Sequence, residues 1–211
     1  MTPLMAETPS RLPPLPVAIA AAGFAVVWFE MLIVGTGDLD DDLLRALYAG
    51  GNPAWIAIAR GFTFLGAAWV GIAVALGGVA LLAWLGRKRA AVVAFLVIAV
   101  GRALVEAQKY AIARLRPIDE AHLVPVSTPS FPSGHAANSM ILCLTFAILF
   151  FGHKRWRWAA IAVAILLSVC IGFSRLMLGV HWPSDVIGGW SFGLLWVVIA
   201  MPWAERLAKQ R

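Results

Sequence analysis

The sequence contains little charge: Asp, Glu, Lys and Arg make up 13% of its 211 residues, about half the share that is usual in soluble domains. Apolar residues make up 61%, and the mean hydropathy is +0.84. Such a chain cannot cover a folded surface with water-compatible side chains, which excludes a soluble globular protein. Disorder is excluded as well, because ten Trp and eleven Phe are too many for a solvated coil.

Cysteine is also scarce: the two cysteines, Cys143 and Cys170, both lie inside apolar runs. Cysteines in such runs behave as small hydrophobic residues, so they predict no disulfide framework and do not identify the redox compartment. The sequence also lacks a group of Cys, His and carboxylate residues with the spacing of a metal site. We therefore expect neither a metal ion nor another cofactor.

In place of charge, the sequence has long hydrophobic runs. A membrane-spanning helix needs about 20 mostly apolar residues. Five charge-free runs fit this requirement, at residues 12–29, 61–86, 136–152, 158–174 and 186–204. A sixth run, 90–110, contains Arg102, Glu106 and Lys109, which need partners or a wet cavity; we interpret Arg102 and Glu106 as a self-neutralising buried pair. The prediction is an all-α membrane bundle of six transmembrane helices, with both termini on one side.

The charges divide unequally between the two ends of this bundle. The end with both termini and the loops 87–89 and 154–157 has ten basic residues and two acids, whereas the other end has six basic residues and seven acids. The positive-inside rule places the first end in the cytoplasm. The net charge of +6 is thus a signal of topology, and no nucleic-acid partner is expected. We predict a multi-pass protein of the inner (plasma) membrane.

The chain divides into one membrane domain and two short tails. We assign residues 1–13 to a Pro-rich cytoplasmic tail, 14–205 to the six-helix domain and 206–211 to a basic cytoplasmic tail. Between the first two spans, residues 40–48 have acids in the first turn and leucines on one face, which is typical of a short amphipathic helix. We interpret it as a connector on the membrane surface, or alternatively as a lip that guides a lipid headgroup.

Three segments carry polar residues at the predicted outer ends of the helices, and residues 109–117 form the first. Lys109 and Arg116 are seven residues apart, nearly two helical turns, so they share a helix face if the helix extends to Pro117. Arg114 lies about 200° around the helix from Arg116, so we expect it to face lipid headgroups or solvent. Taken alone, each of these cations is equally well explained as an interfacial anchor.

The second segment, 132–135, lies directly before the fourth span. Ser133 and Gly134 can form a turn whose N–H groups point outward, and the positive end of the following helix adds to this anion-binding nest. His135 would lie beside the bound anion as a possible proton donor. An ordinary turn with a capping serine is the alternative.

The third segment, 174–185, contains a possible nucleophile. If the chain is helical from near His181, Asp185 lies on the same face and can hold one imidazole nitrogen as N–H, which leaves the other free to attack. Arg175 adds a cation, although it could also be a simple anchor, and a His–Asp pair at this spacing can arise by chance. Together the three segments supply enough cations and N–H donors for a phosphate dianion, and these cations would replace the magnesium of other phosphoryl-transfer sites.

These segments resemble the three-part signature of the type 2 phosphatidic acid phosphatase superfamily, K-x6-RP, PSGH and SR-x5-H-x3-D. All three match without a departure and in the same order, at residues 109–117, 132–135 and 174–185. The resemblance implies a metal-independent lipid phosphatase with its active site at the outer mouth of the bundle. It further implies that its partners are the membrane and a lipid phosphate or diphosphate.

By matched position, the resemblance also implies the role of each residue. His181 would attack phosphorus and form a phosphohistidine, Asp185 would orient His181, and His135 would protonate the leaving oxygen and later activate water. The phosphate would be bound by a further set: Lys109, Arg116, Ser133, Gly134 and Arg175.

The outer location of the site and the compact single domain favour undecaprenyl diphosphate as the substrate. The alternatives are phosphatidylglycerophosphate, phosphatidic acid and transfer of phosphate to a second lipid. A non-catalytic lipid-binding or transport protein is a further alternative from a different class, but such a protein needs no nucleophile.

Overall fold

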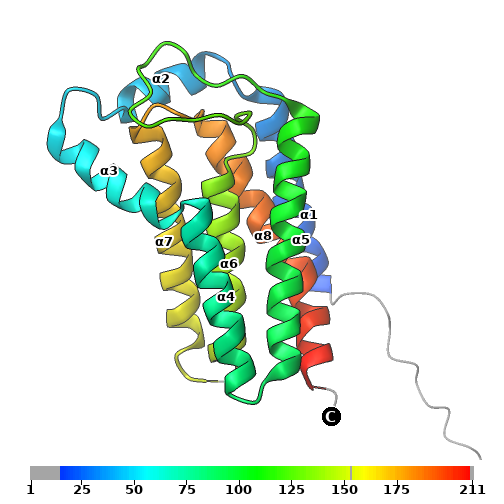
Figure 1. The fold of residues 1–211 in the computed structure, drawn as a ribbon. Coiled ribbons are helices and arrows are strands. Elements are labelled where there is room, and N and C mark those ends of the chain that lie inside the picture. The colour runs from blue at the N-terminus through cyan, green and yellow to red at the C-terminus, as the bar shows by residue number, and fades with distance from the viewer. Residues whose placement is uncertain (1–14, 153, 210–211) are drawn as a thin grey trace, which may run out of the picture.

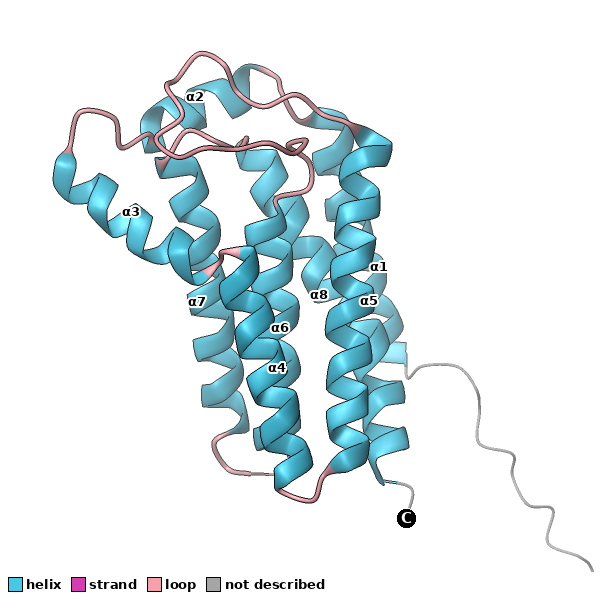
Figure 2. Cartoon of the chain, in the orientation of Figure 1, coloured by secondary structure: helices cyan, strands magenta, loops and turns pink. Residues whose placement is uncertain are grey.

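The computed structural model describes residues 15–152 and 154–209, with side chains through residue 202, and all regular structure in these residues is helical (Figures 1 and 2). The helices are α1 (Leu15–Val34), α2 (Asp38–Leu47), α3 (Pro53–Leu65), α4 (Ala68–Trp84), α5 (Lys88–Ile112), α6 (Gly134–Phe151), α7 (Arg157–Met177) and α8 (Pro183–Lys209). The all-α prediction is confirmed. The tail predicted at 1–13 lies outside the described residues, and the tail predicted at 206–211 lies partly outside them.

Five helices, α1, α5, α6, α7 and α8, are long and apolar enough to cross a membrane. The second predicted span is a bent pair of helices and not one continuous helix over residues 61–86; α3 and α4 together are long and apolar enough to be a sixth span. The two helices meet at a bend of 44°, and Figure 1 shows α3 diverging from the bundle. Gly66 ends α3 and its N–H bonds back to the carbonyl of Thr63 at 3.1 Å, so the last turn is closed before α4 begins.

Close packing of α6 and α8 fixes the upper part of the bundle. A Cβ on Gly193 would lie 2.8 Å from the Cβ of Met140, and a Cβ on Gly189 would lie 2.7 Å from the carbonyl oxygen of Ser133. Both glycines are therefore needed for the close approach of the two helices. This approach holds the N-terminus of α8 against the N-terminus of α6, where the second and third sequence segments lie.

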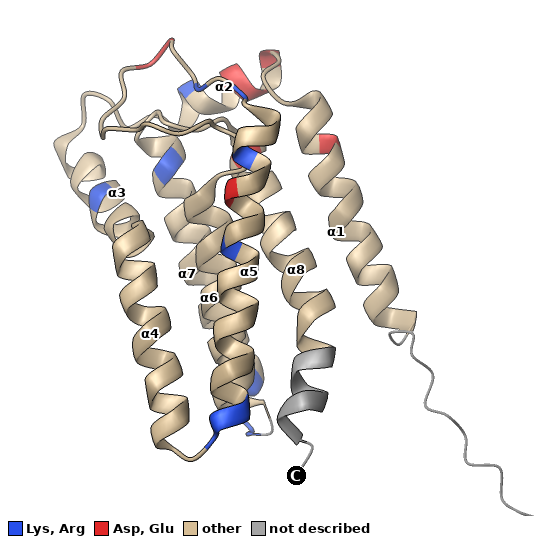
Figure 3. Ribbon diagram, turned by 45° about the vertical axis from the view of Figure 1, so that its right-hand side comes forward, with Lys and Arg blue, Asp and Glu red and all other residues tan. Residues whose placement is uncertain are grey.

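The two ends of the bundle differ in charge (Figure 3). Basic residues occupy the α4–α5 loop at the end where α1 begins and α8 ends. The acidic side chains of the described part of the chain lie toward the opposite end, where α2 and the α5–α6 connection cover the bundle. The fold thus places all three polar segments at the end opposite to the basic loops.

The amphipathic helix predicted at 40–48 is confirmed as α2, but it is more than a connector resting on the membrane surface. Asp40 is only 7% exposed, and it accepts hydrogen bonds from the backbone N–H of Ser184 at 3.0 Å and from the hydroxyl of the same residue. Leu44 packs with Leu176 and Val186. Helix α2 is therefore tied to the first turn of α8.

Candidate active site

A cavity of about 290 Å³ lies beneath the α5–α6 connection. It brings together six of the eight residues predicted for the site: Lys109, Arg116, Gly134, His135, Arg175 and His181. The other two, Ser133 and Asp185, are buried and do not line it. Segments more than 70 residues apart in the sequence therefore line a single polar cavity, as the sequence predicts.

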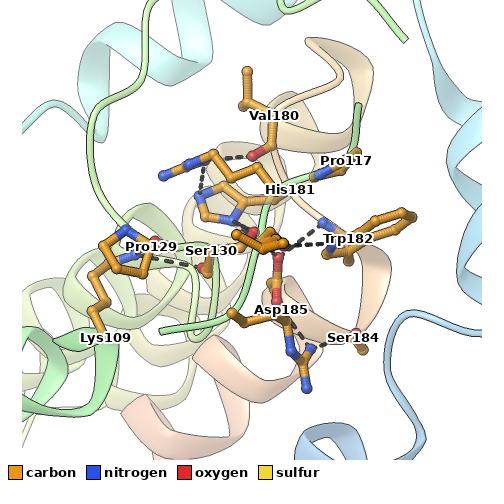
Figure 4. A network of polar contacts seen from close by, with 12 residues as sticks. Lys109, Pro117, Pro129, Ser130, Val180, His181, Trp182, Ser184 and Asp185 are labelled. Carbon is orange, nitrogen blue, oxygen red and sulfur yellow. Dashed lines mark hydrogen bonds and ion pairs between the residues drawn. The ribbon is translucent and has the colours of Figure 1, made fainter. Parts of the chain in front are cut away.

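His181 and Asp185 form the predicted pair, although the helix begins only at Pro183 (Figure 4). The Nδ1 atom of His181 lies 3.3 Å from Oδ2 of Asp185, so Nδ1 carries the proton and Nε2 keeps its lone pair. Burial lowers the pKa of His181 well below its usual value, and the neighbouring cations, Arg116 first, lower it further. His181 is therefore neutral at physiological pH, as a nucleophile must be.

Asp185 is fully buried and would be costly to keep there as an unpaired carboxylate. It accepts hydrogen bonds from the hydroxyl of Ser130 and from the backbone N–H of Trp182, the latter at 2.9 Å (Figure 4). Arg114 completes the set with an ion pair of 3.0 Å. These contacts fix the carboxylate that orients His181, and sequence reasoning missed both Ser130 and Arg114.

The expectation that Arg114 faces lipid headgroups or solvent is wrong. Helix α5 ends at Ile112, and Ala113 adopts a left-handed conformation with φ of 52°, so the helical spacing does not extend to Arg114. Its guanidinium turns inward, where it binds Asp185 and donates to the carbonyls of Met31 and Leu32 at 3.0 and 2.8 Å. No sequence signal marks this end of α5, because residue 113 is neither glycine nor asparagine.

Arg116 lies beside His181 and is held by backbone carbonyls. Its Nε donates to the carbonyl of Thr128 at 2.8 Å, its Nη1 donates to the carbonyl of Val180, and Nη1 lies 3.3 Å from Nε2 of His181. Burial lowers the pKa of Arg116 and Asp185 opposes this shift; a guanidinium nevertheless stays charged. A phosphate that reaches Nε2 of His181 must therefore meet this cation.

Lys109 and the start of α6 form another part of the cavity lining. The Nζ atom of Lys109 donates to the carbonyl of Pro129 at 2.8 Å, which holds the connection just before α6. Ser133 precedes the helix and its buried hydroxyl has no partner within the described residues. Gly134 is not left-handed; a Cβ there would lie 3.3 Å from Cε of Lys109. The predicted glycine turn is thus a helix N-terminus in the structure.

The break between α3 and α4 supports the remaining two site residues. Arg175 donates from Nη1 to the hydroxyl of Thr63, the last buried residue of α3. A Cβ on Gly66 would lie 2.7 Å from Cδ2 of His135, so only glycine fits against this imidazole. Sequence reasoning missed Thr63 and Gly66, because an apolar run gives no sign that it bends toward the cavity.

The contact with Thr63 gives a testable prediction. Thr63→Val removes the hydroxyl that holds Arg175 but keeps the side-chain shape, so we expect kcat/KM on a lipid phosphate to fall about tenfold or more. Thr63→Ser keeps the hydroxyl and should retain most of the activity. Steady-state phosphate release from the two purified variants makes the comparison; equal activities would show that Thr63 does not position Arg175.

Arg102 and Glu106 also line the cavity. They were expected to neutralise each other, but no ion pair forms between these two described side chains. Glu106 instead lies close enough to Lys109 to interact with it electrostatically.

As for metals, residues 15–152 and 154–209 contain no group of three His, Cys, Asp or Glu that could hold an ion.

A family model and several known proteins match this chain. The family model of the PAP2 superfamily matches residues 90–209. Phosphatidylglycerophosphatase B of Bacillus subtilis strain 168 is 35% identical over 120 residues, which cover 55% of this chain and 59% of that protein. An undecaprenyl-diphosphatase of Sulfolobus acidocaldarius is 38% identical over 93 residues, which cover 42% of each chain. The chain thus spans about half the length of these two relatives.

A solved structure extends the likeness beyond the matched segments. The crystal structure of a transmembrane PAP2 type phosphatidylglycerolphosphate phosphatase from Bacillus subtilis superposes with a TM-score of 0.82 at 26% identity, and the match covers 91% of this chain and 99% of that one. The family match includes more than half of the sequence and all three polar segments. With its bundle of apolar helices, the chain is a multi-pass membrane protein that belongs to the PAP2 superfamily.

Proposed function

We propose that the protein is a lipid phosphatase that removes the terminal phosphate of a lipid diphosphate through a phosphohistidine at His181. One observation carries this proposal: the imidazole of His181, held by buried Asp185, lines a cavity together with four cations and a second histidine. A lipid-binding or transport protein would need the cations but not the oriented nucleophile.

In the first step, Nε2 of His181 attacks the terminal phosphorus, a P–N bond forms, and the bond between phosphorus and the bridging oxygen breaks. His135 gives a proton to the departing oxygen. In the second step His135 takes a proton from water, the water oxygen attacks phosphorus, and the P–N bond breaks to release inorganic phosphate. This returns His181 and His135 to their starting protonation states.

The cations act on the charge of the transferred phosphoryl group. Arg116 and Arg175 can each contact two oxygens, whereas Lys109 acts as a point charge. Their positions are fixed before substrate arrives by bonds to Thr128, Thr63 and Pro129. Preorganised charge of this kind stabilises a transition state without further rearrangement.

We propose undecaprenyl diphosphate as the substrate, which is supported by the proposed outer location of the site and by the undecaprenyl-diphosphatase among the relatives. Phosphatidylglycerophosphate is the second candidate, because the superposed crystal structure is that of a phosphatidylglycerolphosphate phosphatase. A panel of both lipids and phosphatidic acid, assayed for phosphate release in detergent, tests the proposal. Preferred cleavage of the diphosphate is expected, and release from none of the lipids would indicate a binding protein.

Metal independence follows from the proposed role of the protein cations. We expect phosphate release to persist in excess EDTA, because no metal ion shares the charge of the phosphoryl group. Vanadate should inhibit by occupying the cavity in which the phosphoryl group is proposed to bind. Loss of activity in EDTA with recovery on adding magnesium would contradict the proposal.

We further propose that both termini and residues 206–211 are cytoplasmic and that the cavity of the 14–205 domain faces the periplasm or exterior. In a background without Cys143 and Cys170, a cysteine at the exposed position Ser127 should react with an impermeant thiol reagent in intact cells. A cysteine at exposed Lys88, at the basic end, should react only after lysis. The reverse pattern would place the active site in the cytoplasm.

A further inference from the structure

Arg102 is a cation inside a membrane-spanning helix without a compensating partner. It lies on α5 two turns closer to the basic end than Lys109, and its side chain makes no ion pair or hydrogen bond with any described residue. Glu106, the acid one turn away, forms no ion pair with it and also interacts electrostatically with Lys109. An uncompensated charge at membrane depth is costly and is found where a ligand or a water-filled cavity meets it.

Arg102 lies at the junction of two cavities. It lines the polar cavity that contains His181 and also a smaller one of about 40 Å³ between α4, α5 and α6. Asn138 lines both cavities as well. The rest of the smaller cavity is lined by glycine, alanine and aliphatic side chains: Gly71, Ile72, Ala75, Ile98, Ile141 and Leu142. The two polar residues thus mark the boundary between a polar chamber and an apolar one.

The order of residues on α6 indicates which part of the substrate reaches this boundary. In an in-line displacement the leaving oxygen departs opposite to the attacking nitrogen, on the side of His135. Asn138 follows His135 by three residues, about one helical turn, and Ile141 and Leu142 follow by one more. A substrate whose leaving oxygen meets His135 therefore places its next group beside Asn138 and Arg102, and its tail toward the apolar chamber.

We propose that Arg102, together with the amide of Asn138, binds a second phosphate of the substrate, the one that stays on the lipid after cleavage. The guanidinium can bond two phosphate oxygens. The Asn138 amide has a buried oxygen without a partner among the described residues, so protein contacts do not fix its orientation and its NH₂ group can turn to an anion.

This inference rests on the proposed phosphatase activity and narrows its substrate class to lipids with two phosphates. Two kinds of lipid share that chemistry: a diphosphate, in which the phosphates are joined directly, and a glycerol-bridged bisphosphate such as phosphatidylglycerophosphate. Both differ from a lipid monophosphate, which would have nothing to place beside Arg102.

Two matched pairs of substrates test the inference. Farnesyl diphosphate is compared with farnesyl phosphate, and dioctanoyl phosphatidylglycerophosphate with dioctanoyl phosphatidic acid, each by kcat/KM for phosphate release in detergent. The variants are Arg102→Gln, Arg102→Lys and the control Arg45→Gln, which removes an exposed cation on α2 outside the cavity. Activity on the monophosphates serves as the check that each variant is folded.

We expect Arg102→Gln to lower kcat/KM about tenfold or more on one or both two-phosphate lipids, and by less than threefold on their monophosphate partners. The kcat/KM of Arg102→Lys on these lipids should lie between that of Arg102→Gln and that of the wild type. The kcat/KM of Arg45→Gln should match the wild type. If kcat/KM falls only for the two-phosphate member of a substrate pair, that member is identified as the ligand: the diphosphate in one pair, the glycerol-bridged lipid in the other. An equal effect on both members of each pair would overturn the second-phosphate site while leaving the phosphatase in place. Wild-type cleavage of monophosphates alone would overturn both proposals.

Discussion

His181→Ala is expected to reduce phosphate release by about four orders of magnitude or more, because without Nε2 no P–N bond can form. The variant should remain folded. Asp185 keeps its bonds from Ser130, Trp182 and Arg114, so removal of the imidazole leaves no orphaned buried charge. The measurement is phosphate release by purified protein, with the melting temperature as the check on folding.

His122→Ala is the matched control for this variant. His122 lies on the α5–α6 connection and contacts the carbonyl of Pro117 at 2.8 Å, and it does not line the cavity. We expect its replacement to leave activity within a few-fold of the wild type. Substantial activity of His181→Ala on the same lipid would assign the nucleophile elsewhere.

Arg114→Gln is expected to lower both activity and stability strongly. The substitution removes the cation 3.0 Å from Asp185 and leaves a buried carboxylate without its counter-ion. Breaking a buried pair on one side costs about 3–5 kcal/mol. We expect a clear fall in melting temperature and a loss of about 100-fold or more in kcat/KM, because an altered Asp185 no longer holds the Nδ1 proton of His181.

The control for Arg114→Gln is Arg45→Gln, which removes an exposed arginine whose distance to Asp119 is 3.9 Å. Exposed pairs of this kind contribute less than about 1 kcal/mol, so the control should behave as the wild type. A lipid-facing Arg114, as predicted from the sequence, would require that Arg114→Gln change activity by only a few-fold. That result would show that the inward contacts of Arg114 have no catalytic importance.

Six residues of the cavity lining could be predicted from the sequence, because each belongs to a short motif with its own chemistry. The helices α6, α7 and α8 were predicted to within about three residues at their N-terminal ends, because charge and proline limit the apolar runs there. The C-terminal end of α5 was not predicted, because Ala113 takes a left-handed conformation that alanine rarely adopts.

The residues behind the cavity could not be predicted. Ser130, Thr63 and Arg114 act through contacts with residues that are 55, 112 and 71 positions away. No local pattern distinguishes such a serine, threonine or arginine from a solvated one. The bend at Gly66 could not be predicted either, because hydropathy records how apolar a segment is and not whether it is straight.

The central claim is that His181 becomes covalently phosphorylated. It is tested most directly by mixing the enzyme with a lipid diphosphate labelled in the terminal phosphate, quenching within one turnover, and locating the label on the protein. We predict a phosphoryl group that is stable to base, labile to acid, located on His181 and missing from His181→Ala. A wild-type enzyme that turns over the lipid while its label lies on another residue, or on none, would contradict the account.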